Sequence, residues 1–411
     1  MNRIKTGFTL LVLFMLASCA EDKVNQASLK MDAPNEFVIV SIQESSNGEY
    51  VCIGKTLAEN LSVVLTYNSD LVLTNVQYPG ENPKLAGWLT MTKLENENWI
   101  IGASTYWPIG PIGIFVTDKN FNVLHETHEY ADIEYPKSIY EVKQLKNGDY
   151  LVVRDSVNAG SLILIKRYDA QLNTVFAASS FQNLDTTSGV SVTFNSPFTY
   201  ELPDESIFYS VIREANGWKG VFPGPFFQIA EDDVLTGVLE KNGELRYKTN
   251  TPVEVTHVES IGLSYTGSHM MLNNIVNDEH LLYYTLIDPK DGEWIKSNQL
   301  IGNYRNHQHQ DPFFGGHFPR GDENALPATL KPNQGHLIFS EEDNQLIFMG
   351  VDADANLTPR FLVFLPPFDE MLSYRQHFAE NGNIIIGVSY RYKGKIYFNI
   401  QELTMSGEIV E

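Results

Sequence analysis

The stretch that decides the fold is Asn147-Gly148-Asp149-Tyr150-Leu151-Val152-Val153, because related stretches recur along the chain at a nearly constant spacing. They begin at Asn47, Asn96 and Asn381, and each places a polar turn before an aromatic or β-branched run. Asn96 follows Asn47 by 49 positions, and Asn147 follows Asn96 by 51. Asn-Gly before such a run is a strong hairpin signal, since both residues tolerate the positive φ of a type I′ turn. The pattern predicts an antiparallel hairpin about every fifty residues.

A second turn signal follows each of these stretches after one further strand. It is a short turn at residues 67–71, 117–121, 168–172 and 403–408, with two more examples at 241–244 and 290–293, and all of these except 403–408 contain Asp or Asn. Each unit therefore has the pattern of a four-stranded antiparallel meander. We expect weaker units around residues 203–206, 277–280 and 343–344.

A meander with two apolar faces has to bury both of them. Stacking the units in a ring does this and leaves only short exposed edges. We therefore expect an all-β fold, a β-propeller of four-stranded antiparallel blades. Residues 34–411 are 378 positions, and about 54 residues per blade gives seven blades, with six or eight as alternatives. Windows with the apolar periodicity of a helix are absent from the sequence.

The N-terminus has the pattern of a signal peptide over residues 1–18. Arg3 and Lys5 precede an apolar run from Phe8 to Leu16, which is too short to span a bilayer. The run ends in Leu16-Ala17-Ser18-Cys19, and this motif resembles the lipobox of bacterial lipoproteins. The resemblance implies cleavage before Cys19 and attachment of acyl chains such as palmitate to that cysteine. Residues 19–33 would be the lipidated cysteine and a short tether, and residues 34–411 the propeller domain.

Two further features resemble lipoproteins of the Bacteroidota. The acidic pair in Ala20-Glu21-Asp22-Lys23 is similar to their surface-export signal, and the repeating unit of turn, aromatic residue and β-run is similar to their β-propeller lipoproteins. The resemblance implies an outer-membrane lipoprotein, on the cell surface or on the periplasmic side, that meets the membrane through its lipid anchor.

Charge and cysteine content agree with an exported protein. The net charge is −22, from 29 Lys+Arg and 51 Asp+Glu, and no basic stripe is present, which excludes nucleic acid as a partner. Removal of residues 1–18 removes two cations and gives −22 − 2 = −24, so anionic headgroups would repel the domain itself. After lipidation only Cys52 remains, and its apolar surroundings in the sequence predict an inert buried thiol.

Three insertions interrupt the repeat, at residues 106–113, 218–227 and 304–321. They are rich in aromatic residues, which stack on sugar rings and dominate binding hot spots. The candidate ligand-binding residues are Trp107, Trp218, Phe226, Phe227 and Tyr304. The alternative is that these aromatic side chains form a hydrophobic lid over one end of the central channel.

The third insertion also contains the one candidate metal site. His307 and His309 alternate in an extended segment and would point to the same side, where Asp311 could join them around a divalent metal ion. Besides this metal we expect no cofactor.

Recognisable catalytic motifs are missing from the sequence. It contains no sialidase-type Asp box, no Gly-x-Ser-x-Gly elbow and no phosphate-binding Gly loop. This favours a binding protein whose aromatic loops engage a glycan, a peptide or a partner protein of a surface complex. The enzymatic alternative is a propeller hydrolase that cleaves a polysaccharide through channel-facing carboxylates, whose positions the sequence does not assign. A structural scaffold is the third possibility.

Overall fold

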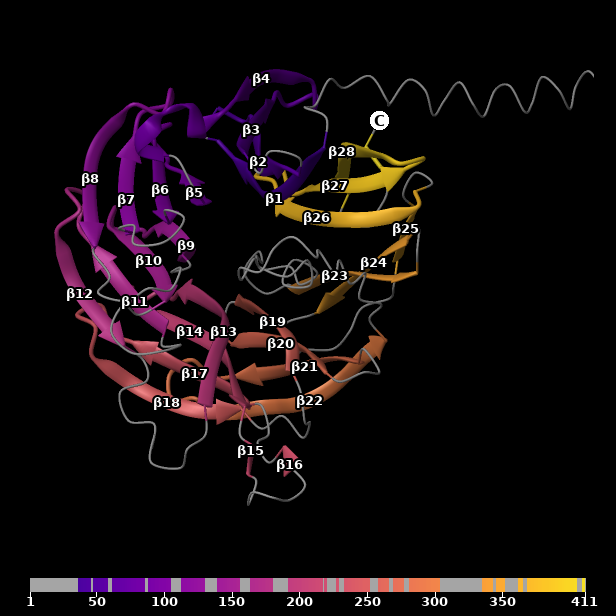
Figure 1. Ribbon diagram of the computed structural model, residues 1–411. Coiled ribbons are helices and arrows are strands. Elements are labelled where there is room, and N and C mark those ends of the chain that lie inside the picture. The colour runs from indigo at the N-terminus through magenta and orange to yellow at the C-terminus, as the bar shows by residue number, and fades with distance from the viewer. Residues whose placement is uncertain are drawn as a thin grey trace, which may run out of the picture.

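Regular structure in this protein consists almost entirely of β-strands (Figure 1). The computed structural model describes residues 36–45, 47–57, 61–85, 88–104, 112–129, 139–155, 163–179, 191–216, 218–219, 227–228, 233–251, 258–265, 269–276, 281–303, 335–342, 345–351, 361–364, 368–404 and 409–410. In these ranges the chain forms two short 3-10 turns, η1 (Pro79–Glu81) and η2 (Pro83–Leu85), and no α-helix. The expectation of an all-β chain is confirmed.

The strands form antiparallel sheets that follow one another around a ring (Figure 1). The first contains β1 (Phe37–Glu44), β2 (Tyr50–Thr56), β3 (Ser62–Tyr67) and β4 (Leu73–Gln77). The second contains β5 (Trp88–Lys93), β6 (Trp99–Ser104), β7 (Ile112–Thr117) and β8 (Val123–Glu129). The third contains β9 (Ile139–Gln144), β10 (Tyr150–Asp155), β11 (Ile163–Tyr168) and β12 (Thr174–Ser179).

The remaining sheets repeat this order. One contains β13 (Ser191–Glu201), β14 (Ile207–Asn216), β17 (Asp233–Leu239) and β18 (Leu245–Thr251), with the small hairpin β15 (Trp218–Lys219) and β16 (Phe227–Gln228) inserted at its middle. The next contains β19 (Val258–Tyr265), β20 (Met270–Val276), β21 (Leu281–Ile287) and β22 (Trp294–Asn303). Two sheets have three described strands: β23 (Gly335–Glu342), β24 (Gln345–Val351) and β25 (Phe361–Phe364), then β26 (Glu370–Phe378), β27 (Ile384–Tyr392) and β28 (Lys395–Leu403).

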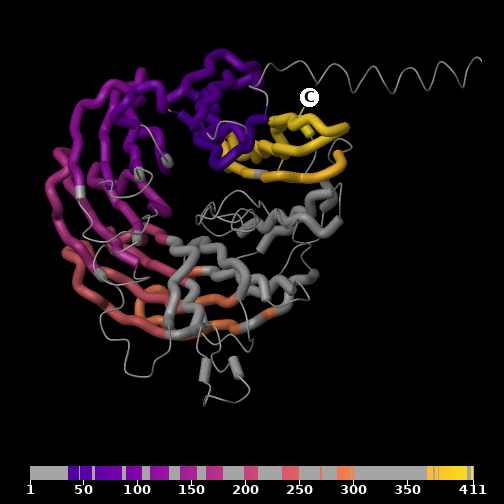
Figure 2. Tube along the Cα trace, in the orientation of Figure 1, coloured from indigo at the N-terminus to yellow at the C-terminus, as the bar shows by residue number. Residues whose placement is uncertain are grey.

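These sheets are the blades of a β-propeller, and five of them have the expected four antiparallel strands. The described part of the chain contains seven sheets of three or four strands. The number of blades in the complete ring stays a prediction. Figure 2 shows that the first described sheet (indigo) lies beside the last one (yellow).

The first turn of the blades differs from the expected type I′ turn. Gly148 N donates to Leu145 O at 2.9 Å, Leu145 N donates to Asp149 O at 2.8 Å, and Gly148 has a φ of 88°. This geometry is a type I turn followed by a G1 bulge, which needs one positive φ and not two. In this turn the side chain of Asn147 accepts a hydrogen bond, from Asp149 N to Asn147 Oδ1 at 3.1 Å. The same backbone bonds close the turns at 45–49, 94–98, 202–206 and 379–383.

One expected first turn lies at a different position in its blade. Residues 277–280 connect β20 to β21, the second and third strands of their sheet, whereas the repeat pattern had suggested a first turn. A polar segment before an apolar strand marks either kind of connection, so the local sequence does not separate them. Residues 203–206 do connect the first two strands of their sheet, and 343–344 connect β23 to β24.

Apolar clusters fill the spaces between adjacent sheets. One cluster joins Ile100 and Ile114 of the β5–β8 sheet to Ile139 and Val152 of the β9–β12 sheet. Another joins Phe37 and Cys52 of the first sheet to Phe398 of the last. Cys52 is fully buried, and burial raises the pKa of its thiol, which confirms the inert thiol. Both faces of a sheet are thus covered by neighbouring sheets, as the ring requires.

Side chains also join the innermost strands, whose channel-facing edges have no partner among the described strands. Thr90 Oγ1 in β5 donates to Ile139 O in β9 at 2.8 Å, and Thr92 Oγ1 donates to Val142 O at 2.5 Å. At the junction of last and first sheets, Ser373 Oγ in β26 donates to Ile39 O in β1 at 2.8 Å. Carbonyls that no strand can reach are therefore satisfied by the neighbouring blade.

The antiparallel order gives the ring two different ends. We call the turn end the one that carries the first turns and the turns between third and fourth strands, including residues 145–149 and 169–173. We call the opposite end the loop end. There the second strand of each four-stranded sheet connects to the third, and the fourth strand leads on to the next sheet. Because successive strands reverse direction, these connections depart from the same end of every such sheet.

Candidate functional site

All three aromatic insertions depart from the loop end. Ser104 of β6 and Ile112 of β7 border the first insertion, and the β15–β16 hairpin lies between β14 and β17. The third insertion follows Asn303, the last residue of the fourth strand β22. Three segments far apart in the sequence therefore start at one end of the ring.

The predicted site residues are only partly described. Trp218 lies in β15 opposite Gln228, and Phe227 lies in β16 opposite Lys219. The others lie outside the described residues: Cys19, Trp107, Phe226, Tyr304, His307, His309 and Asp311. Their assigned roles stay predictions.

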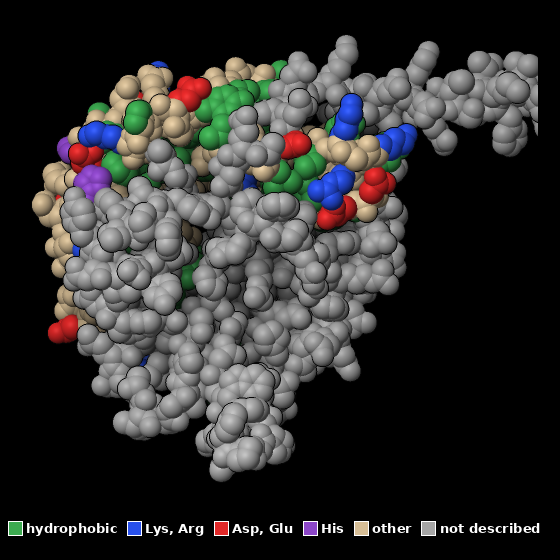
Figure 3. All heavy atoms as spheres, in the orientation of Figure 1, with side chains coloured by type: hydrophobic (Ala, Val, Ile, Leu, Met, Phe, Trp, Pro, Cys, Tyr) green, Lys and Arg blue, Asp and Glu red, His purple; other side chains and the backbone are tan. Residues whose placement is uncertain are grey.

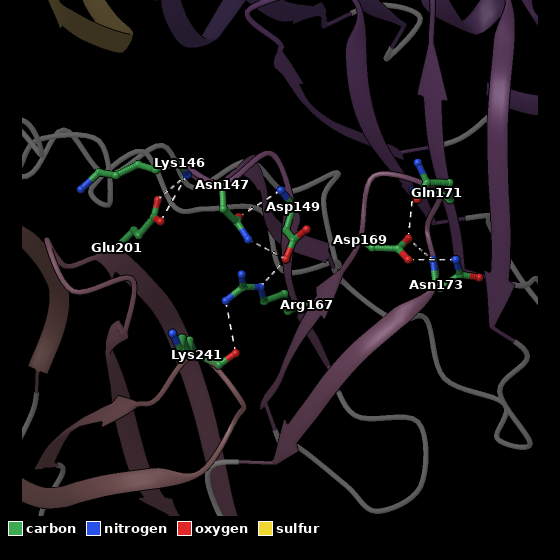
Figure 4. Close-up of polar contacts among 9 residues, drawn as sticks. All are labelled: Lys146, Asn147, Asp149, Arg167, Asp169, Gln171, Asn173, Glu201 and Lys241. Carbon is green, nitrogen blue, oxygen red and sulfur yellow. Dashed lines mark hydrogen bonds and ion pairs between the residues drawn. The ribbon is translucent and has the colours of Figure 1, made fainter.

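The turn end is occupied by structural hydrogen bonds, as Figure 4 shows for two adjacent sheets. Arg167 of β11 is 5% exposed, and its Nε lies 2.7 Å from Asp149 Oδ2 in an ion pair. Its Nη1 donates to Lys241 O of the next sheet at 3.2 Å. This arginine therefore joins the first turn of its own blade to a turn of the next blade.

Other carboxylates at the turn end are engaged in the same way (Figure 4). Glu201 Oε2 accepts a hydrogen bond from Lys146 N of the preceding sheet at 2.9 Å. Asp169 accepts from Gln171 N, Asn173 N and Asn173 Nδ2 at 2.8 to 2.9 Å, and the Asn173 bonds hold its pKa below the ordinary value. These acidic side chains stabilise turns and blade contacts.

Carboxylates on the inner strands are also bound to neighbouring blades. Glu141 of β9 forms an ion pair with Lys143 at 2.7 Å and accepts from Thr199 Oγ1 of β13 at 2.5 Å. Glu44 of β1 accepts from Glu380 N at 2.8 Å and lies 3.4 Å from His377 Nε2. Burial lowers the pKa of His377, and Glu44 opposes that shift without reversing it.

At the loop end, the hairpin that joins β27 to β28 carries lysine and tyrosine side chains. Lys393 and Gly394 form its two-residue turn with φ of 51° and 75°, the signature of type I′. Tyr390 and Tyr397 are direct cross-strand partners whose rings stack with centroids 5.7 Å apart. We call residues 390–397 the basic hairpin. Lys393 and Lys395 are exposed, and Figure 3 shows Lys and Arg side chains over β26–β28 with Asp and Glu side chains among them.

The start of β26 holds the basic hairpin in place. Asp369 Oδ2 accepts from Lys393 N at 2.6 Å, and Asp369 N donates to Arg391 O at 2.8 Å. Glu370 and Arg391 are cross-strand partners and form an ion pair. Phe368 packs at 6.1 Å from the ring of Tyr390. The neighbouring strand therefore holds the backbone of the hairpin and the side chain of Arg391.

A second pair of cations lies between the β5–β8 and β9–β12 sheets. Arg154 is 2% exposed and stands next to the last residue of β10, close to the loop end. Lys166 Nζ of β11 lies 4.9 Å from the centroid of the Tyr168 ring. Burial, and then the charge of Arg154, lower the pKa of Lys166. Because Tyr168 ends β11 at the turn 169–173, the contact between Lys166 and Tyr168 lies toward the turn end and does not belong to the surface of the loop end.

Sequence reasoning missed the basic hairpin, although its signal is plain. Tyr390-Arg391-Tyr392-Lys393-Gly394-Lys395-Ile396-Tyr397 alternates aromatic and cationic residues around a turn. The predicted binding residues came from long insertions that interrupt the repeat. This hairpin is too short to interrupt it and therefore did not stand out.

The described ranges contain neither a metal-binding cluster nor a membrane-spanning helix. No group of three or more His, Cys, Asp or Glu side chains in them is placed to hold a metal ion. Among the same residues, no helix has the length and apolar character needed to cross a membrane.

Comparison with known proteins supports the fold. The chain is similar to a solved ulvan lyase from a new family of polysaccharide lyases, with a TM-score of 0.57 and 13% identity over 90% of this chain and 95% of that chain. It is also similar to such an ulvan lyase bound to -[GlcA(1-4)Rha3S]-, with a TM-score of 0.54 and 12% identity over the same shares. No protein-family model and no curated protein matches the sequence. At these identities the likeness concerns the fold alone.

Proposed function

We propose that this chain is an exported, lipid-anchored β-propeller that binds an acidic polysaccharide at its loop end. The observation that carries the proposal is the basic hairpin, where tyrosines accompany the exposed lysines, whereas exposed lysines as such also occur at the turn end, at Lys146 and Lys241. At the turn end, Arg167, Asp149 and Glu201 are engaged in bonds within and between blades. The loop end presents exposed lysines beside tyrosines, and the three aromatic insertions start there.

The chemistry of the loop end fits an anionic sugar polymer. Aromatic rings stack on the apolar faces of sugars, and Lys and Arg form charge-assisted hydrogen bonds with carboxylate and sulfate groups. The saccharide bound to the similar lyase, -[GlcA(1-4)Rha3S]-, carries groups of this class. A chain with a net charge of −22 needs such local cations, because its overall field repels an anionic ligand.

Binding without cleavage is favoured over the hydrolase alternative. The inner-strand carboxylates Glu44 and Glu141 are held by a backbone N–H or a side chain of an adjacent blade. A glycosidase needs two carboxyl groups that face the substrate across the scissile bond. Cleavage remains the second candidate because the chain shares its fold with a polysaccharide lyase. Release of new reducing ends from a bound polysaccharide would support cleavage.

The binding experiment uses residues 24–411 on an array of acidic and neutral polysaccharides. Trp218→Ala and Trp107→Ala should each weaken retention of the best acidic polysaccharide. The matched control is Trp294→Ala, because Trp294 is 41% exposed and follows a turn at the opposite end of the ring. Failure of the wild-type chain to retain any acidic polysaccharide would contradict the proposal, as would an equal loss in the control.

The anchor is tested separately in the native host. We propose that Cys19 is acylated, with palmitate among the chains, and that the protein belongs to the outer membrane in the manner of Bacteroidota lipoproteins. Several acyl chains make such an anchor effectively stable. Mass spectrometry should find lipid on Cys19, and Cys19→Ala should move the protein from the membrane fraction to the soluble fraction. An unmodified Cys19 would contradict this part of the proposal.

A further inference from the structure

We propose that the basic hairpin, residues 390–397, is a binding site for the carboxylate or sulfate groups of an acidic polysaccharide. The inference rests on the proposed function and names the residues and the ligand groups. The site consists of the exposed side chains of Lys393 and Lys395, with the half-buried rings of Tyr392 and Tyr397 beside them.

The residue preference of a type I′ turn does not favour lysine at position 393. Both residues of a type I′ turn need positive φ, and Asn-Gly is the preferred pair because Asn tolerates that conformation better than other side chains. Here Lys393 takes the first position with a φ of 51°. Asn would suit this position at least as well as Lys, so exchange of Lys393 for Asn removes the charge without disfavouring the turn.

The charges are concentrated and differ from the rest of the chain. Three cations occur within residues 391–395, in a protein with 29 Lys+Arg against 51 Asp+Glu. Arg391 forms an ion pair with Glu370, which fixes the base of the hairpin. Lys393 Nζ lies 4.8 Å from the centroid of the Tyr392 ring, so the ring and the ammonium group form one surface.

This surface is rigid before a ligand arrives. Asp369 binds the backbone N–H of Lys393 and the carbonyl of Arg391, and Tyr390 stacks on Tyr397 beneath the tip. Because the backbone that carries the two lysines is held in advance, binding does not have to order it, which lowers the entropy cost. The spacing of cations on a short hairpin suits successive anionic groups along a polymer.

A lipid headgroup carries similar anionic chemistry, but a membrane is the poorer fit. The net charge of −22 repels an anionic bilayer over its whole face, and two lysines do not offset that repulsion. A flexible polymer reaches the lysines at the tip of the hairpin, while Glu370 at its base is paired with Arg391. Polysaccharide is therefore the ligand we assign, and membrane binding is an outcome that the experiment can reveal.

The experiment measures the affinity of residues 24–411 for dextran sulfate and for neutral dextran, which differ only in charge. The variant is Lys393→Asn with Lys395→Gln. Its matched control is Lys248→Gln with Lys290→Gln, which changes the net charge equally at two exposed lysines far from the hairpin in sequence. We expect binding of dextran sulfate, no binding of dextran, and about 5- to 10-fold weaker binding in the hairpin variant alone.

A stability measurement separates binding from folding. Lys393→Asn suits the type I′ turn better, so its thermal unfolding midpoint should equal or exceed that of the wild type while its affinity falls. Absence of dextran sulfate binding, or equal loss in the control variant, would overturn the inference. Lysine-dependent retention on phosphatidylglycerol vesicles without dextran sulfate binding would overturn it in favour of a membrane site.

The outcomes distinguish this inference from the proposed function. If array polysaccharides bind normally to the hairpin variant, the function stands and the hairpin site is wrong. If dextran sulfate binds through the hairpin but no array polysaccharide is retained, the anion site stands and the proposed polysaccharide function is wrong.

Discussion

Ile39 N donates a hydrogen bond of 3.0 Å to Ser389 Oγ, although the two residues are 350 positions apart in the sequence. The bond is buried and joins β1 of the first sheet to β27 of the last. Ile39 borders the irregularity in the β1–β2 pairing, at which the register shifts between Ile39 and Ser41. A side chain from the opposite end of the chain thus satisfies a backbone group at a bulge, and it connects the last described sheet to the first.

Ser389→Ala should therefore weaken the junction between first and last sheets. The substitution leaves the buried N–H of Ile39 without its acceptor, a loss of about 1–3 kcal/mol in the free energy of unfolding. Urea unfolding measures the change. Ser69→Ala, at an exposed turn position, should change the free energy by less than about 0.5 kcal/mol. Equal effects of the two substitutions would contradict the assigned role of Ser389.

A larger loss is expected at Arg167. Asp149→Ala leaves the guanidinium of Arg167, whose side chain is 6% exposed, without its carboxylate partner. Removal of one partner from a buried pair costs roughly 3–5 kcal/mol. Glu126→Ala breaks the exposed pair with Lys84 and should have little effect on the unfolding midpoint. A small effect of Asp149→Ala would show that solvent reaches Arg167 and replaces the carboxylate.

The close approach of two blades predicts a steric effect at Gly102. A Cβ atom at Gly102 would lie 2.8 Å from Ile139 Cδ1 of the next blade. Gly102→Val should therefore destabilise the protein by about 1–3 kcal/mol through overpacking. Gly80→Ala is the control, because a Cβ there meets no atom within 4 Å. Circular dichroism during heating compares the two variants, and equal midpoints would refute the tight packing.

Two turn aspartates predict a loss of stability in acid. Hydrogen bonds from Asn122 lower the pKa of Asp118, and bonds from Asn173 lower the pKa of Asp169. A carboxyl group with a depressed pKa in the folded state stabilises the protein above its unfolded pKa of about 3.9. That contribution is lost as the pH falls through the lower folded value.

The measurement is the unfolding midpoint from pH 7 to pH 2. Asp118→Asn with Asp169→Asn should reduce the dependence on pH below about 4, because the amide cannot be protonated there. Asp70→Asn is the control, since Asn68 and not Asp70 accepts the corresponding bonds in its turn. An acid dependence identical to that of the wild type in the double variant would contradict the assignment.

Much of the fold could be predicted because each blade repeats a local signal. Asn147-Gly148 and Asp169 mark turns through backbone chemistry that acts within five residues, so the sequence reveals them directly. The turn type was wrong because Asn-Gly suits both a type I′ turn and a G1 bulge, and Glu97, with a φ of 67°, fills the position of Gly148 in the second sheet. The contact of Ile39 with Ser389 has no local signal at all.

The candidate site was less predictable for a related reason. Trp218 and Phe227 were chosen from composition, and the strand order is needed to show that their hairpin departs from the same end of the ring as the basic hairpin. The pairing of Tyr390 with Tyr397 requires the register of β27 and β28, which depends on where the turn lies. The engagement of Glu141 has no signal in the sequence, because its bond to Thr199 comes from another blade.

The central claim, that ligand binds at the loop end, is tested most directly by hydrogen exchange with mass spectrometry. The protein is compared with and without the acidic polysaccharide that the array retains most strongly. We predict slower exchange in peptides covering residues 390–397 and the connections on either side of Trp218, with no change at the turns 45–49, 145–149 and 202–206. Slower exchange confined to those turns, or no change at the loop end, would contradict the account.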